Sequence, residues 1–549
     1  MSRTTRTLQV AGALGVAVAV AVLPTPPGLT SAGQYALATT AFAAVLWVGG
    51  GLPLSVTALL VPVLLTIFGV YPRFEGALSG FADPVLFLFL GTFVLAGALQ
   101  SHGLDRRMAL ALVAAVGTGP RRTLLGVMVT SAALSMVISN TATAAMMIPV
   151  ALGLAGAPAG DLPAAGDAAD TPAGTDDRRD ASPTDPADEP TPERAYQTAL
   201  VLGVAYAASV GGVGTLVGSP TNAIAVAQID AALGVRITFV DWLTVGLPTV
   251  VLTLPIVWLL LCRLFPAEAV DEVGPGAGIA PGTETETDAA ALARGVSDGG
   301  PRGLADLDPG ARRVALVFAA VAALWILGGI GALFRDRLPA AVAATLFGGP
   351  GPSVFGAGDH QGVLYFALVG VLAVPALVLW CDVDADDLAG IDWNTLVLFG
   401  GGISLADALL DTGATRWLAD AIFGAVLGVP LVALLGVIVL LSVALSELAS
   451  NTATVAILAP VLIEVGVANG ALYGLAPVDA GVTLAMATAI AASYGFALPV
   501  ATPPNAIAFG TGAVSRREML RAGLATDLLL AAATTAVLFA LATLGVLGG

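Results

Sequence analysis

The sequence predicts an all-α polytopic membrane protein with about eleven transmembrane helices and two re-entrant hairpins in an inverted-topology repeat. Its 549 residues are 57% hydrophobic and 11% charged, with a mean hydropathy of +0.90, which exceeds what a soluble core needs. A second observation is a polar phrase that occurs twice inside apolar sequence, as SMVISNTAT and as SELASNTAT. Paired polar breaks at membrane depth are typical of a transporter's binding site.

The apolar segments give the predicted spans, because crossing the hydrocarbon takes ~20 residues. The spans are roughly 8–23, 35–50, 52–70, 83–101, 196–217, 239–262, 313–334, 362–380, 392–410, 481–500 and 523–547.

Two further apolar segments, 123–154 and 430–466, do not fit a simple count of spans. Each is too long for one upright helix and too short for two spans with a turn. We expect each to be a hairpin of two half-length helices, broken at its SNTAT tip and returning to the face that it entered. Such hairpins occur where their backbone is buried in protein or lines a water-filled cavity.

Most of the net negative charge lies in two hydrophilic stretches. The net charge of −17 includes −7 from Asp161–Arg194 and −7 from Glu268–Asp308, so both stretches are predicted to be solvated, disordered loops. Every one of the 22 basic residues is an arginine. The positive-inside rule favours the arrangement in which both long segments are hairpins, with the N-terminus cytoplasmic and the C-terminus external.

Three pairs of motifs recur in the same order. GTFVLAGALQSHG at 91–103 aligns with GGISLADALLDTG at 401–413, the SNTAT tips follow, and GSPTN at 218–222 then matches ATPPN at 501–505. The two sets have opposite orientations in the predicted topology, as in transporters that work by alternating access. Segments 104–116 and 414–426 carry arginines on a broken apolar pattern and are predicted to be interfacial helices.

The tips carry the predicted chemistry. Serine, asparagine and threonine cap helices, so each tip begins a half-helix whose free N–H groups and positive dipole end form an anion site. The preceding half-helix ends in unpaired carbonyl oxygens, and Ser135, Ser139 and Ser446 add hydroxyls, which suit an alkali cation. Pseudo-symmetry thus predicts two cation sites beside one anion site.

The other polar residues give weaker indications of function. His102, His360, Cys262 and Cys381 are isolated, so no enzyme and no nucleic-acid partner is predicted. Glu447 stands in the second tip where the first has Met136. A buried carboxylate there can serve either proton coupling or structural hydrogen bonding.

The SNTAT tips, with GSPTN and ATPPN after them, resemble the divalent anion:sodium symporter (DASS) family, the di- and tricarboxylate and sulfate carriers, from about residue 83 to residue 512. The resemblance implies a homodimeric elevator transporter, in which a hairpin-bearing transport domain slides against a fixed scaffold. One co-transported sodium ion would be held by Ser135, Ser139, Asn140 and Gly218, and the other by Ser446, Ala449, Asn451 and Ala501. Substrate carboxylates would meet Asn140, Thr141, Ser450, Asn451 and Thr452, with Ser219, Pro220, Thr502 and Pro503 near them.

Under that resemblance the chain divides into five parts. Residues 1–121 contain scaffold helices and the first interfacial helix, 122–262 the first transport half, 263–311 an acidic cytoplasmic loop, 312–429 scaffold helices and the second interfacial helix, and 430–549 the second transport half. The first half comprises hairpin 123–154, acidic loop 156–195, broken helix 196–230 and span 239–262, and the second comprises hairpin 430–466, broken helix 481–512 and span 523–547.

The predicted function is a sodium-coupled importer of C4-dicarboxylates such as succinate, malate or fumarate, in the plasma membrane. A sulfate or tricarboxylate symporter is the near alternative. A sodium-independent anion exchanger and an arsenite or proton-linked antiporter are more distant ones. No arginine lies at either tip, and N–H groups, hydroxyls and bound sodium discriminate weakly between carboxylate and sulfate.

Overall fold

A computed structural model describes residues 3–105, 107–108, 119–155, 191–266, 307–349, 351–356, 358, 360–423, 429–448 and 450–546. Within these ranges every regular element is a helix, apart from one isolated bridge between Gly349 and His360. The predicted all-α fold is confirmed. In chain order the elements are α1 (Arg3–Val22), α2 (Ser31–Gly49), α3 (Leu54–Ile67), α4 (Phe74–Ala77), η1 (Ser79–Ala82), α5 (Pro84–Ser101), α7 (Pro120–Ser135), α8 (Asn140–Leu154), α9 (Pro192–Gly212), α10 (Pro220–Leu233), α11 (Phe239–Leu264), α13 (Pro309–Ala332), η4 (Arg335–Arg337), α14 (Ala340–Phe347), α15 (Phe366–Trp380), α16 (Ala385–Ala389), α17 (Trp393–Asp411), α18 (Ala414–Phe423), α19 (Leu431–Leu448), α20 (Asn451–Asn469), η5 (Gly470–Tyr473), α21 (Pro477–Ala492), α22 (Pro503–Gly510) and α23 (Arg516–Thr543).

Nine helices in the described ranges are long and apolar enough to cross a membrane, namely α1, α2, α5, α11, α13, α17, α19, α20 and α23. Three predicted spans correspond to shorter helices, α3, α15 and α21, of 14, 15 and 16 residues. The predicted span 196–217 is α9, whose residues are almost all buried. The arms of the first predicted hairpin, α7 and α8, have 16 and 15 residues, whereas those of the second, α19 and α20, have 18 and 19 and are each as long as a span. The prediction of half-length arms is therefore wrong for the second hairpin.

Helix starts follow the local sequence. Proline occupies the first turn of α5, α9, α10 and α13, where its missing N–H costs nothing. Asp83 caps α5 by accepting from the N–H of Val85 at 2.8 Å, and Asp308 caps α13 by accepting from the N–H of Ala311 at 3.2 Å. These caps satisfy N–H groups that the helices cannot pair internally.

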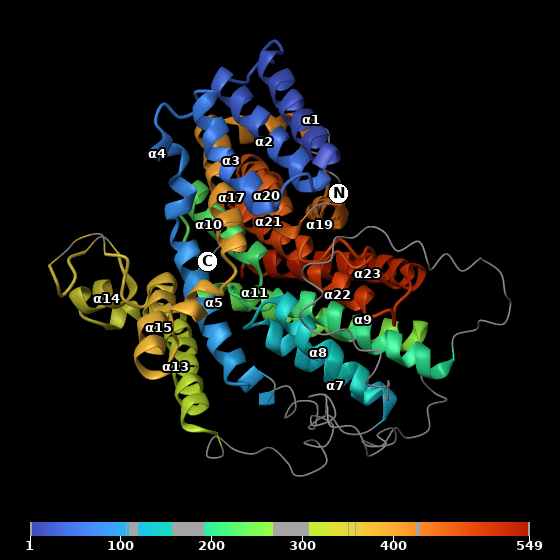
Figure 1. The fold of residues 1–549 in the computed structure, drawn as a ribbon. Coiled ribbons are helices and arrows are strands. Elements are labelled where there is room, and N and C mark those ends of the chain that lie inside the picture. The colour runs from blue at the N-terminus through green and yellow to red at the C-terminus, as the bar shows by residue number, and fades with distance from the viewer. Residues whose placement is uncertain are drawn as a thin grey trace, which may run out of the picture.

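The two copies of the repeat are interleaved. Helix α22 packs against α8 and α9 although it comes from the C-terminal part of the chain, and Figure 1 shows it beside them. Its counterpart α10 packs against α20 and α21, while α11 packs against α23. The same exchange occurs earlier in each copy, because α3 packs against α17 and α15 packs against α5. Each copy therefore completes the other.

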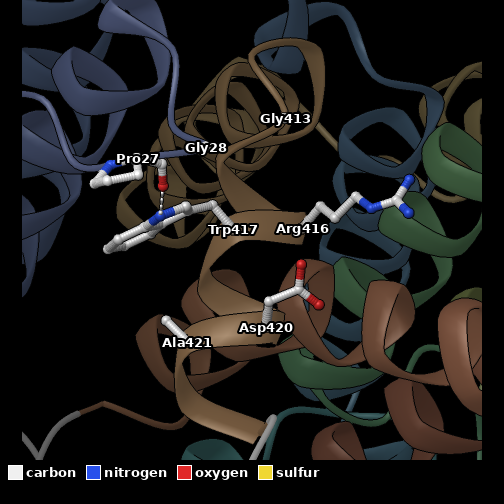
Figure 2. A pocket seen from close by; sticks show the side chains of 7 residues that line it. All are labelled: Pro27, Gly28, Gly413, Arg416, Trp417, Asp420 and Ala421. Atoms are coloured by element: carbon white, nitrogen blue, oxygen red, sulfur yellow. Dashed lines mark hydrogen bonds between the residues drawn. The ribbon is translucent and has the colours of Figure 1, made fainter.

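The predicted second interfacial helix is α18, which lies between α2 and α20. Trp417 Nε1 donates to the carbonyl oxygen of Pro27 at 3.3 Å, and Thr30 Oγ1 donates to that of Thr412 at 3.1 Å. A shallow pocket of about 440 Å³ opens beside this contact (Figure 2), and none of the predicted site residues lines it. Its lining residues are Pro27, Gly28, Gly413, Arg416, Trp417, Asp420 and Ala421.

Several predicted segments lie outside the described residues. They are most of the first interfacial helix, at 106 and 109–118, and the central parts of both acidic loops, at 156–190 and 267–306.

Candidate functional site

The first tip joins the arms of the first hairpin by a short turn between Ser135, the last residue of α7, and Asn140, the first of α8. Ser139 caps α8, because its Oγ accepts a hydrogen bond from the N–H of Ala142 at 3.2 Å. The Asn140 amide contacts Ser135 Oγ, and its nitrogen faces the carbonyl oxygen of Gly218 at 3.3 Å. The other N–H groups at this helix end present the positive end of the dipole to an anion.

The second tip joins α19 to α20 in the same way. Ser450 caps α20 with a hydrogen bond of 3.2 Å. Ser446 Oγ lies 2.7 Å from Asn451 Oδ1 and 2.6 Å from the carbonyl oxygen of Ala492, which is the last residue of α21. The tip therefore lies against the point where the next helix stops. Ala449, which the resemblance assigns to sodium, lies outside the described residues.

The first break, residues 213–219, separates α9 from α10. Asn222 closes it, because its Nδ2 donates to the carbonyl oxygens of Gly212 at 2.9 Å and Thr215 at 2.7 Å. Thr215 Oγ1 in turn donates to the carbonyl oxygen of Met136. This bond connects the break directly to the first tip.

The second break, residues 493–502, separates α21 from α22. Asn505 closes it with the same spacing, because its Nδ2 donates to the carbonyl oxygens of Gly495 at 2.9 Å and Leu498 at 3.0 Å. Thr502 caps α22 by accepting from the N–H of Asn505 at 3.3 Å. The final asparagine of each repeated motif thus holds its break in shape.

The two breaks meet in the buried interior, where Thr221 and Ser493 are fully buried. Thr221 Oγ1 lies 2.8 Å from Ser219 Oγ and 2.8 Å from Ser493 Oγ, so a chain of hydroxyls joins them. Tyr206 OH also donates to the carbonyl oxygen of Phe496 at 3.1 Å. The structure therefore brings the GSPTN motif of the first copy to the second break.

Oxygen atoms converge around Gly218. A Cβ there would lie 2.6 Å from the carbonyl oxygen of Gly212 and 2.9 Å from that of Ser135. Hydroxyl and carbonyl oxygens are the ligands that a hard cation prefers, so these carbonyl oxygens are of the type that the predicted sodium ion would need. The equivalent residue of the second copy is Ala501, which is buried at 7% exposure and brings a methyl group. The two predicted sodium sites are therefore not identical.

The predicted substrate contacts differ in accessibility. Buried members contribute to the shape of the site, whereas the more exposed ones are reachable by an ion. Ser219, Thr452 and Thr502 are buried, Asn140, Pro220, Ser450 and Asn451 are half-buried, and Thr141 and Pro503 are exposed.

Glu447 accepts hydrogen bonds from the second break. Its Oε1 accepts from the N–H of Ala497 at 2.7 Å and its Oε2 from the N–H of Leu498 at 3.1 Å. Next to them, Asp527 Oδ1 accepts from the N–H of Phe496 at 3.4 Å. Two carboxylates thus hold three successive N–H groups of the second break.

Sequence reasoning missed part of this arrangement. Asn222 and Asn505 received no role, although each ends a repeated motif and that repetition was a usable signal. Asp527 was also passed over, although a carboxylate inside an apolar span is a functional candidate. The contact between Thr221 and Ser493 had no signal in the sequence, because 272 residues separate them.

Comparisons with known proteins match nearly the whole chain. A family model described as the sodium:sulfate symporter transmembrane region matches residues 4–544. An uncharacterized transporter of Haemophilus influenzae is 31% identical over 512 residues, which cover 92% of this chain and 90% of that protein. The sodium-dependent dicarboxylate transporters SdcS of Staphylococcus saprophyticus and Staphylococcus aureus are each 29% identical over 513 and 509 residues, covering 92% of this chain and 85% of theirs.

Among solved structures, the YdaH transporter of Alcanivorax borkumensis superposes with a TM-score of 0.51, covering 99% of this chain and 98% of that one. Its sequence identity is 16%, so this likeness supports the fold alone.

Proposed function

We propose that this chain, which belongs to the sodium:sulfate symporter family, is a sodium-coupled symporter of divalent organic anions, specifically C4-dicarboxylates. The family match over residues 4–544 makes the chain a membrane transporter rather than an enzyme, as the motifs predicted. The names of the staphylococcal relatives support sodium coupling and a dicarboxylate substrate.

One observation carries the proposal: two capped helix starts and two asparagine-closed breaks gather in one place. The caps Ser139 and Ser450 leave further N–H groups free at each helix start, which suits the two ends of a divalent anion. The oxygens around Gly218 supply a cation site beside them. Bound sodium would offset part of the anion's charge, so the ion and the anion bind better together than alone.

The mechanism that we propose is an elevator stroke within a homodimer. Helices α7–α11 and α19–α23 are interleaved through α10 and α22, which favours their movement as one body. That body meets the remaining helices through α20 against α17 and α18, through α10 against α17, and through α11 against α13. We further propose a cytoplasmic N-terminus and an external C-terminus.

The first experiment is uptake into proteoliposomes. Radiolabelled succinate should accumulate with an inward sodium gradient and should not accumulate when choline replaces sodium. Labelled sulfate should accumulate far less under the same conditions. Accumulation of sulfate alone would make the chain a sulfate symporter, and succinate accumulation without sodium would contradict the proposed coupling.

The second experiment tests orientation. In a variant with Cys262 and Cys381 replaced by serine, a cysteine at Ala155 should react with a membrane-impermeant maleimide from the cytoplasm, and one at Asn469 from outside, because each hairpin returns to its own face. External labelling at Ala155 would show that the first segment crosses the membrane, and would contradict the inverted-topology repeat.

A further inference from the structure

A pair of carboxylates lies beside the second break. Glu447 comes from α19 and Asp527 from α23, and the two side chains are close enough to interact directly. Both are engaged with backbone N–H groups of residues 496–498. Neither side chain belongs to the predicted ligand sets for sodium or substrate.

The charge of this pair is poorly compensated. Asp527 is only 5% exposed, and its Oδ2 has no hydrogen-bond donor. The polar group that faces the pair from α9 is the hydroxyl of Tyr206, which donates to a backbone oxygen instead. Along α23 the nearest basic residue is Arg521, which is exposed. A buried carboxylate beside a half-buried one is costly when no described residue forms an ion pair with either, so a cation is expected between them.

The first copy of the repeat provides a built-in comparison. Helices α11 and α23 both begin with a capping box, Thr238 with Asp241 and Ser515 with Glu518, which aligns the two helices. In this alignment Val250, buried at 3% exposure, takes the place of Asp527. Glycines confirm the register, because Gly246 packs on the carbonyl of Val213 and Gly523 on that of Phe496.

The pair is therefore confined to the second copy. Met136 stands where the second copy has Glu447, so apolar residues occupy both equivalent positions in the first copy. If the carboxylates only supported the fold of the repeat, we would expect them in both copies.

We propose that Glu447 and Asp527 bind a third sodium ion, separate from the ions at the two tips. Asp527 Oδ2 supplies an unpaired oxygen, and the Glu447 carboxylate supplies the second ligand beside it. Carboxylate oxygens are hard ligands suited to such a cation. The inference rests on the proposed function, because the ion would be carried with the other two.

The test counts sodium ions by a readout other than transport. The melting temperature of the detergent-solubilised protein is measured against sodium concentration, with choline as replacement and without substrate. The slope of stability against the logarithm of sodium concentration gives the number of ions taken up on folding. Asp527→Asn and Glu447→Gln keep the shape and one acceptor oxygen, and each should lower that number by one. Their double variant should lower it no further.

Two more variants separate the third ion from its neighbour. Glu464→Gln removes a carboxylate of α20 with no role in the site and should keep the wild-type number. Asn451→Ala should lose the second tip's ion, so Asn451→Ala with Asp527→Asn should lose two. Loss of only one ion in that combination would mean that the pair merely supports the tip, and would overturn the proposal.

An unchanged number of ions in both amide variants would also overturn it, including the case in which the pair holds a proton instead. Should Asp527→Asn not fold, Glu447→Gln decides alone. These outcomes are independent of the uptake assay. Sodium-independent uptake by the wild type would contradict the proposed function, whatever the ion count shows.

Discussion

The two breaks share a motif and an asparagine closure, yet they hold their backbone in different ways. Helix α9 continues to Gly212, and the next two N–H groups bond back to the carbonyl oxygens of Val210 and Gly211. The residue equivalent to Gly212 in the second copy is Gly495, but α21 already ends at Ala492. Relative to the repeat, the helix before the second break therefore ends three residues earlier than the helix before the first. The N–H groups of residues 496–498 bond to the carboxylates of Glu447 and Asp527 instead.

This difference shows how one motif can produce two unlike ion environments. In the first break a neutral side chain, Trp242, donates to the carbonyl oxygen of Val213 at 2.9 Å. In the second break Glu447 and Asp527 bring negative charge within reach of the backbone. Negative charge favours cations in a buried setting, so we expect the second copy to bind sodium more tightly than the first.

The largest expected effect tests what the two copies share. Asn140→Ala and Asn451→Ala each remove an amide that connects a tip to its surroundings. Each should lower sodium-driven uptake by at least ~10- to 100-fold, because that range applies when a group that only orients an ion's ligands is lost, and here a predicted ligand itself is removed. Uptake per inserted protein is the measurement, with surface labelling to count inserted molecules. A severe loss in one variant beside normal uptake in the other would show that only one tip is functional.

A second prediction tests where the copies differ. Gly218→Ala adds a methyl group among the oxygens of Gly212 and Ser135, and such overpacking costs ~1–3 kcal/mol. The sodium concentration for half-maximal uptake should rise about tenfold, since each 1.4 kcal/mol is a factor of ten. The reverse change, Ala501→Gly, relieves no clash and should shift it by less than about twofold. Equal shifts in the two variants would contradict the asymmetry of the sites.

Much of this arrangement could be predicted from the repeated motifs in the sequence. The helix starts at the SNTAT tips, the breaks after them and the helix α18 all follow from local signals, namely caps, prolines and apolar periodicity. The interleaving of α10 with the second copy and of α22 with the first was not predicted. Such contacts depend on side-chain packing between segments far apart in the chain, which single-sequence patterns do not record.

The carboxylate pair illustrates the same limit. Glu447 was noticed because its counterpart Met136 is apolar, whereas Asp527 lies eighty residues away in a span outside the three repeated motif pairs. Only the three-dimensional arrangement places both on the same stretch of backbone. A polar residue in an apolar segment can thus be flagged from sequence, but its partner cannot.

The smallest expected effect concerns the helices that follow the breaks, where the copies are alike again. Thr238 Oγ1 accepts from the N–H of Asp241 at 3.2 Å, and Ser515 Oγ accepts from the N–H of Glu518 at 3.3 Å. Thr238→Ala and Ser515→Ala each remove one cap, which costs about 1 kcal/mol.

In a chain of this size that loss should lower the melting temperature by no more than about 2 °C, and by the same amount in both variants. Thermal unfolding in detergent, with sodium present and with choline instead, provides the measurement. Because both caps lie at helix starts outside the breaks, the two shifts should not depend on sodium. A sodium-dependent shift in Ser515→Ala alone would mean that the asymmetry of the second break extends along α23 to its start, and that the carboxylate pair is not a local feature.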